Sequence, residues 1–126
     1  EENYFLSLKY NKVNVRYGPG LDYPIKFVYL KKNFPLKIID EKEKFRKMID
    51  DKNNSGWVHR SQLKKNNSLI VLEEKRLFNN FTKYSKPVAV IKSGRMLIVK
   101  KKEKKWFTVA TGSYVGWVKN ENLWGY

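Results

Sequence analysis

The chain has 126 residues, of which 41% are hydrophobic and 15% aromatic, with a formal net charge of +15 and no cysteine. This apolar content is typical of a globular protein, and the lack of cysteine excludes disulfides and thiolate metal sites. No apolar run approaches the roughly 20 residues that a membrane-spanning helix needs, so we expect no transmembrane segment.

The first residues are Glu1-Glu2-Asn3, without a methionine. A removed signal peptide would explain this start, and trimming of the chain is the alternative. On the first interpretation the chain is an exported protein of the periplasm or cell envelope, and the sequence alone does not separate the two.

Short alternating segments and turn residues fill the first 40 positions. Tyr4–Leu8 and Val13–Arg16 alternate apolar and polar residues, which predicts strands with one buried face. Residues 16–24 contain two glycines and two prolines and must form a loop. Residues 25–30 and 36–39 are predicted to be the next two strands.

The segment Phe45–Ile49 has two interpretations. Phe45, Met48 and Ile49 have the spacing of one turn of amphipathic helix. The segment Trp106–Thr111, which matches it in the second half of the chain, is rich in aromatic and β-branched residues and predicts a strand. Because matching segments should share a structure, we predict that both are strands.

A sequence repeat organises the whole chain. Gly56-Trp57-Val58 recurs as Gly116-Trp117-Val118, an offset of 60 residues (116 − 56). The offset between Phe45 and Trp106 is 61 (106 − 45), so one residue has been gained or lost between the two points. A nearly constant offset over some thirty positions indicates a duplicated domain.

Short strands, turns rich in glycine, asparagine and aspartate, and no long helical period predict an all-β fold of two small barrels in tandem, packed against each other. We expect the first barrel at residues 1–64, the second at 69–126, and a short linker at 65–68. A single helical turn is expected near Ser61-Gln62-Leu63. The predicted core consists of Val15, Val28, Leu36, Ile38, Val58, Leu63, Ile91, Leu97, Phe107, Val109, Val118 and Leu123.

Two motifs of the first half resemble the bacterial Src-homology-3-like (SH3b-type) domain family. They are Val13-Asn14-Val15-Arg16-x-Gly18-Pro19-Gly20-x-x-Tyr23-Pro24-Ile25 and Gly56-Trp57-Val58-His59-x-Ser61-x-Leu63. The resemblance covers residues 6–63 and implies two SH3-like barrels, as in tandem-repeat exported proteins of alphaproteobacteria. The second copy has Lys75-Arg76-Leu77-Phe78-Asn79-Asn80-Phe81 in place of the first motif and is similar to a degenerate partner domain.

Groups for catalysis are scarce. The chain has one histidine, His59, and its counterpart in the second copy is Lys119. A hydrolytic site needs a base beside a nucleophile, and a lone imidazole binds metal poorly. We therefore expect no enzyme, no cofactor and no metal site, and interpret His59 as an exposed polar residue on a strand.

A ligand groove on the first barrel is the remaining hypothesis. Strand alternation points Val58 to the core and Trp57 outward, where its ring either lines a groove or packs against the other barrel. Tyr17 and Tyr23 flank the Pro-Gly loop and are the expected second wall, with Arg16 and His59 at the rim. The alternative is that Arg16 and the tyrosines serve only to stabilise that loop.

The resemblance implies a non-catalytic binding or adaptor module that recognises cell-wall peptide (peptidoglycan) or another extended peptide. The alternative is an electrostatic binder of nucleic acid or an anionic envelope surface, with weak and nonspecific contacts from its lysines. The densest lysine run, residues 100–105, lies between two predicted strands and is most simply a solvated turn. We expect a monomer.

Overall fold

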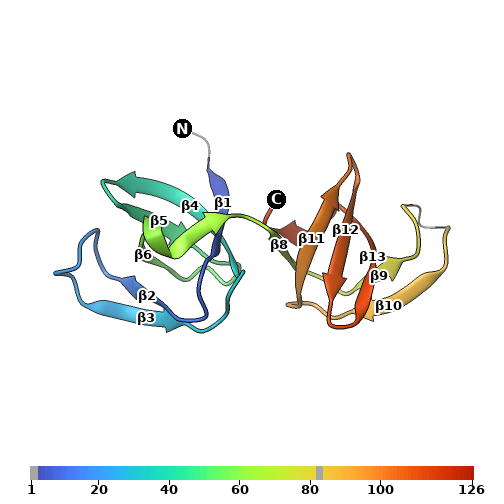
Figure 1. The fold of residues 1–126 in the computed structure, drawn as a ribbon, viewed down its shortest axis with the longest axis horizontal. Coiled ribbons are helices and arrows are strands. Elements are labelled where there is room, and N and C mark those ends of the chain that lie inside the picture. The colour runs from blue at the N-terminus through green and yellow to red at the C-terminus, as the bar shows by residue number, and fades with distance from the viewer. Residues whose placement is uncertain (1–2, 82–83) are drawn as a thin grey trace. The chain divides into compact units, whose positions relative to one another are not determined.

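The computed structural model describes residues 3–81 and 84–126, which form two compact units (Figure 1). The first unit extends to Asn66 and includes Gly125 and Tyr126, and the second is Asn67–Trp124. Each unit has its own sheet and its own core, and we refer to them as the first barrel and the second barrel.

Seven antiparallel strands form the first barrel, in the order β3-β2-β6-β5-β4-β1-β7. One turn of 3-10 helix, Arg60–Gln62, links β6 to β7. The strands are β1 (Tyr4–Leu8), β2 (Val13–Arg16), β3 (Ile25–Tyr29), β4 (Pro35–Lys42), β5 (Phe45–Ile49), β6 (Ser55–His59) and β7 (Leu63–Lys65).

The second barrel repeats this topology strand for strand, in the order β10-β9-β13-β12-β11-β8-β14. Its strands are β8 (Ser68–Val71), β9 (Lys75–Phe78), β10 (Pro87–Ile91), β11 (Met96–Lys102), β12 (Trp106–Thr111), β13 (Tyr114–Lys119) and β14 (Leu123–Trp124). The predicted all-β fold of two SH3-like barrels is confirmed, and so is the strand interpretation of Phe45–Ile49.

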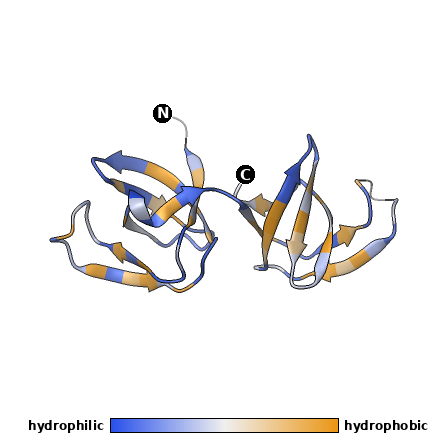
Figure 2. Ribbon diagram, viewed as in Figure 1, coloured by the Kyte–Doolittle hydropathy of each residue, from blue (hydrophilic) through white to orange (hydrophobic). Residues whose placement is uncertain are grey.

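Alternation along the strands separates core from surface in both barrels (Figure 2). Ten of the twelve predicted core residues are buried, as are several that we did not predict, among them Leu8, Met48 and Leu77. Val28 was predicted wrongly: it is 38% exposed, because Phe27 and Tyr29 of β3 pack against the core and Val28, which alternates with them, lies on the outer face. Leu123 is only half-buried, in the two-residue edge strand β14.

The junction between the barrels is shorter than the predicted linker of residues 65–68. Lys65 is the last residue of β7 and Ser68 is the first of β8, so only Asn66 and Asn67 lie between the strands. The Asn66 side chain is fixed within the first barrel, where it accepts a hydrogen bond from Ser7 Oγ (2.7 Å) and donates one to the carbonyl of Gly125.

Matching turns have matching backbone conformations. Asn33 has a φ of 73° and Gly94 a φ of 89°, in the left-handed region that asparagine and glycine tolerate best. The amide of Asn33 donates to the carbonyl of Leu8, and the amide of Gly94 donates to the carbonyl of Val71. The duplication thus preserved a backbone requirement although the residue type changed.

A buried carboxylate organises the β5–β6 turn of the first barrel. Asp50 is 4% exposed, and its side chain accepts hydrogen bonds from the amides of Lys52 and Asn54 and from the hydroxyl of Tyr29 (2.8 Å). Burial, and then the bond to Asp50, raises the pKa of Tyr29 well above its usual range, so the hydroxyl stays protonated and remains a donor.

In the part of the chain that the structure describes, no helix has the length and hydropathy to span a membrane.

Candidate functional site

The outer face of β6 is the starting point for the site. Gly56 and Val58 are buried, so the residues that alternate with them, Trp57 and His59, lie on the opposite face. Arg16 of β2 is directly opposite Trp57, and Phe45 of β5 is directly opposite His59. Side chains of directly opposed residues share a face of the sheet, so these four residues belong to one surface.

The Pro-Gly loop closes over one side of this surface. A Cβ on Gly18 would lie 2.3 Å from two ring atoms of Tyr23, so the ring occupies the space that the missing side chain leaves. One guanidinium nitrogen of Arg16 donates to the carbonyls of Tyr23 (2.8 Å) and Leu21 (3.3 Å). Glycine, tyrosine and arginine thus hold the loop in one conformation.

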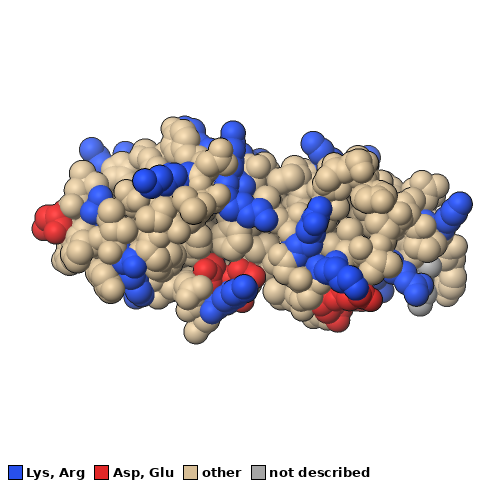
Figure 3. All heavy atoms as spheres, turned by 90° about the horizontal axis from the view of Figure 1, so that it is seen from below, with Lys and Arg blue, Asp and Glu red and all other residues tan. Residues whose placement is uncertain are grey.

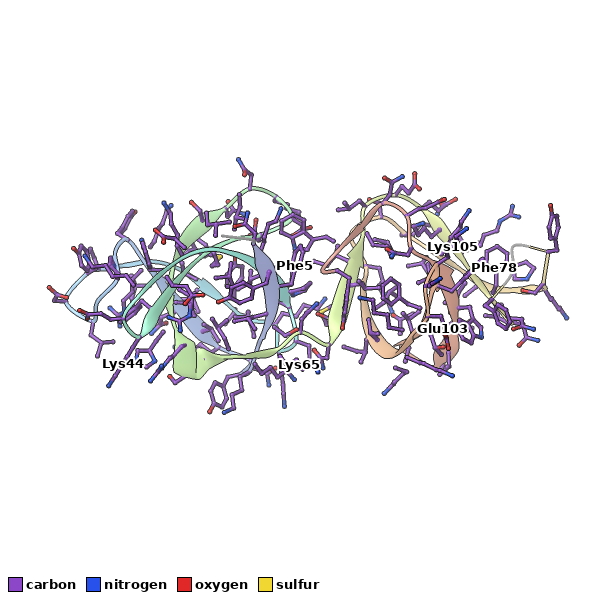
Figure 4. All side chains as sticks on the ribbon, turned by 90° about the horizontal axis from the view of Figure 1, so that it is seen from above. Phe5, Lys44, Lys65, Phe78, Glu103 and Lys105 are labelled. Atoms are coloured by element: carbon purple, nitrogen blue, oxygen red, sulfur yellow. The ribbon has the colours of Figure 1, made fainter. Side chains whose placement is uncertain are left out.

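An open groove of about 540 Å³ lies between this loop and the 3-10 turn. It is lined by Asn14, Arg16, Leu21, Phe45, His59 and Gln62, with Lys12 and Ser61 beside them. Leu21, Phe45 and His59 also border a neighbouring hollow that reaches Glu43 and Lys44 in the β4–β5 turn. Figure 4 labels Lys44, which marks this turn. The groove thus combines polar side chains, which can donate and accept hydrogen bonds, with a small apolar wall formed by Leu21 and Phe45.

The His59 side chain caps the 3-10 turn that follows it, Arg60–Gln62. Its Nδ1 accepts a hydrogen bond from the amide of Ser61 (3.1 Å) and lies 2.7 Å from the Ser61 hydroxyl. The matching residues of the second barrel, Lys119 and Glu121, make an ion pair of 3.0 Å. The contact between His59 and Ser61 is an N-cap of the 3-10 turn, and the second barrel joins the same two positions by an ion pair instead.

The structure brings together some of the predicted site residues. Arg16 and His59 are among the residues that line the groove, whereas Trp57 is not, although it shares their face of the sheet. Tyr23 packs on the loop, and Tyr17 is 61% exposed with the Lys26 ammonium 5.7 Å from its ring centre. Neither tyrosine is among the residues that line the groove.

Sequence reasoning missed Asn14, Leu21 and Phe45. Asn14 alternates with the buried Val13 and Val15, so its outward direction was readable from the strand pattern. Leu21 has a weaker signal, namely a large apolar residue in a loop, and it is 72% exposed. Phe45 lies 5.1 Å from the His59 ring, edge to face, a contact that follows from the β5–β6 register and not from the sequence.

Positive charge is spread over the face shown in Figure 3 rather than gathered in one patch. Blue lysine and arginine side chains occur over the whole face shown, with few red carboxylates between them. Within residues 3–81 and 84–126, no cluster of three or more histidine, aspartate or glutamate side chains has the arrangement of a metal site.

Comparison with known proteins places the fold in a family. The sequence profile of the bacterial SH3 domain matches residues 9–65 and again residues 78–125. The first match covers most of the first barrel, and the second begins at the end of β9 and covers most of the second barrel. No curated protein sequence matches the chain.

Two solved structures from Trichomonas vaginalis, described as NlpC2 and NlpC1, are similar to this chain. The similarity to NlpC2 has a TM-score of 0.44 at 10% identity and covers 97% of this chain and 48% of the other. For NlpC1 the TM-score is 0.44 at 11% identity, with 98% and 46% covered. The chain therefore spans about half the length of these two proteins.

Proposed function

The chain belongs to the bacterial SH3 domain family, and we propose that it is a non-catalytic binding module of the cell envelope whose first barrel binds cell-wall peptide (peptidoglycan) or another extended peptide. The groove between the Pro-Gly loop and the 3-10 turn is the binding site in this proposal. In this proposal the ligand contacts Asn14, Arg16, Leu21, Phe45 and His59.

The observation that carries the proposal is the composition of this groove. Asn14, Arg16 and Gln62 offer donors and acceptors to the amides and carboxylates of a peptide, and Leu21 and Phe45 offer an apolar wall. A loop held by Gly18, Tyr23 and Arg16 keeps the wall in place before a ligand arrives. Such preorganisation lowers the entropic cost of binding.

A binding role fits the chemistry of the groove better than catalysis. The Nδ1 atom of His59 already accepts a hydrogen bond from the Ser61 amide, and the Ser61 hydroxyl accepts one from Gln62 Nε2 (3.2 Å). Because Nδ1 is the acceptor, the neutral ring carries its proton on Nε2, and neither nitrogen has a free lone pair for the proton that a general base removes. We propose a monomeric protein of the periplasm or cell envelope that uses no cofactor.

The proposal predicts that Asn14→Ala with Leu21→Ser weakens retention of the chain on purified cell-wall sacculus by about tenfold. Both residues are exposed, so the barrel should keep its stability. The matched control is Tyr17→Ser, which changes an equally exposed aromatic residue outside the groove. The measurement is a pull-down at low and high salt, with circular dichroism to confirm the fold.

Equal retention of the double variant and the wild type at high salt would contradict the proposed groove. The net charge of +15 favours a second function, electrostatic binding of polyanions such as nucleic acid or an anionic envelope surface. In that case added DNA should displace the chain from sacculus, and retention should vanish at high salt for every variant.

A further inference from the structure

The second barrel has an apolar groove of its own. About 540 Å³ in volume, it is lined by Phe81, Trp106 and Trp117 together with Lys101, Lys104 and Glu103, and Lys105 lies beside them. The groove lies between the loop after β9 and the β11–β12 turn, the same place as the hollow beside Leu21 in the first barrel. Phe78, Glu103 and Lys105 are labelled in Figure 4.

The rings of Phe81, Trp106 and Trp117 form the floor of this groove, and Phe78, which does not line it, packs edge to face against Trp106. The Phe81 and Trp117 rings are 5.5 Å apart, and the Phe78 and Trp106 rings are 5.9 Å apart. Phe81 is 59% exposed, whereas the two tryptophans are half-buried. Edge-to-face contacts are a favoured arrangement of aromatic rings, so these residues form a continuous apolar surface at the floor.

Residues that replace the Pro-Gly motif of the first barrel supply part of this aromatic cluster. Trp117 is directly opposite Phe78 in the β9–β13 pair, just as Trp57 is directly opposite Arg16 in the β2–β6 pair. Phe78 therefore occupies the position of Arg16, and Phe81 falls on the loop where Pro19 lies in the first barrel. The loop still closes, because the amide of Asn79 donates to the carbonyl of Lys86, as that of Tyr17 does to Pro24.

Lysines surround the floor. Lys101 forms an ion pair with Glu103 (3.2 Å), whereas no ion pair of Lys104 or Lys105 occurs among the described residues. Both of these lysines are exposed at the mouth of the groove. The corresponding turn of the first barrel carries Glu43 and Lys44, which balance each other. The two grooves therefore differ in charge as well as in apolar character.

We propose that the second barrel is a separate binding site for an acidic extended peptide, whose apolar residues lie on the aromatic floor and whose carboxylates meet Lys104 and Lys105. An extended chain fits because alternate side chains point to opposite sides, so one set contacts the rings and the other reaches the rim. A single nucleic-acid strand is the less suitable occupant, since it needs a basic track along its whole backbone. This proposal does not depend on the ligand of the first barrel.

The test measures binding of a fluorescein-labelled hexapeptide, Leu-Glu-Leu-Glu-Leu-Glu, by fluorescence anisotropy, because its apolar and acidic residues alternate. Phe81→Ala and the pair Lys104→Glu/Lys105→Glu should each raise the Kd by about tenfold or more. The matched control, Lys31→Glu/Lys32→Glu, lowers the net charge by the same four units, from +15 to +11 (15 − 4), at exposed lysines of the first barrel. It should change the Kd by less than about twofold.

Three outcomes would overturn the proposal. An equal loss in both lysine pairs would show nonspecific attraction, and unchanged binding by Phe81→Ala would show that the floor is not used. Tighter binding of a hexathymidylate than of the peptide, lost in Phe81→Ala, would assign the groove to nucleic acid. The sacculus experiment with Asn14→Ala and Leu21→Ser probes the other barrel, so failure of either proposal can be recognised separately.

Discussion

Replacing Val58 by aspartate is expected to unfold the first barrel, and replacing Val118 by aspartate to unfold the second. Both valines have no exposed surface and belong to the cores of their respective barrels. An unpaired carboxylate there costs about 4 kcal/mol or more. A domain of about 60 residues seldom has more than about 3–5 kcal/mol of stability from its core, so the substitution should unfold the barrel that contains it.

The matched controls are Val28→Asp in the first barrel and Val90→Asp in the second. These valines are 38% and 54% exposed on the edge strands β3 and β10, so an aspartate can remain hydrated. Urea unfolding followed by circular dichroism should show lost structure for the core variants and little change for the controls. Wild-type stability of Val58→Asp would mean that the inner and outer faces of β6 are reversed.

The second large effect is expected from valine in place of the repeated glycine, Gly56 or Gly116. A Cβ on Gly56 would lie 2.3 Å from Val15 Cγ1, and one on Gly116 would lie 2.8 Å from the carbonyl oxygen of Phe78. Val15 is fully buried in the core and the Phe78 carbonyl belongs to a paired strand, so neither can move aside without disturbing the core or the sheet. Overpacking of this kind costs about 3 kcal/mol, which should lower the urea midpoint of the affected barrel.

Gly94→Asn is the control for this experiment. A Cβ on Gly94 would meet no atom of the described residues within 4 Å, and the φ of 89° at this glycine resembles the 73° of Asn33 at the matching turn. Asparagine at position 94 should therefore be tolerated. If Gly56→Val and Gly94→Asn destabilised the chain equally, the glycine of the repeat would be needed for something other than space.

Most of the fold was readable from the sequence because the duplication supplied a second copy of each element. Phe45, Met48 and Ile49 alone permit a helical turn, and only the aromatic and β-branched residues of Trp106–Thr111 decided for a strand. Burial was harder to predict on the edge strands. Val28 looks like a core residue in sequence, but its neighbours Phe27 and Tyr29 face the core, so Val28 lies on the outer face of β3 and is partly exposed.

The candidate site was only partly predictable. Strand alternation placed Arg16, Trp57 and His59 on the outer face, and the structure agrees. The directions of Tyr17 and Tyr23 could not be inferred, because loop side chains have no fixed period. Tyr23 lies over Gly18, so the tyrosine and the glycines of this motif determine the shape of the loop. Leu21 and Phe45 form the apolar wall of the groove instead.

Loss of the Pro-Gly motif in the second copy suggested a degenerate domain. This expectation did not consider the aromatic residues that replace the motif. The loop closes in both barrels by equivalent backbone hydrogen bonds, from Tyr17 to Pro24 and from Asn79 to Lys86. Closure therefore does not require the motif. Once Arg16 is replaced by Phe78, the same position packs edge to face against Trp106 and contributes to an aromatic surface.

The most direct test of the proposed function is an NMR titration of the 126-residue chain with a soluble disaccharide-peptide fragment of peptidoglycan. Binding in the groove of the first barrel should shift the backbone amide signals of Asn14, Arg16, Leu21 and His59, which surround it. These shifts should persist at high salt, because part of the contact is apolar. Saturating fragment that leaves these four signals unmoved, or that shifts only residues 100–105, would contradict the proposal.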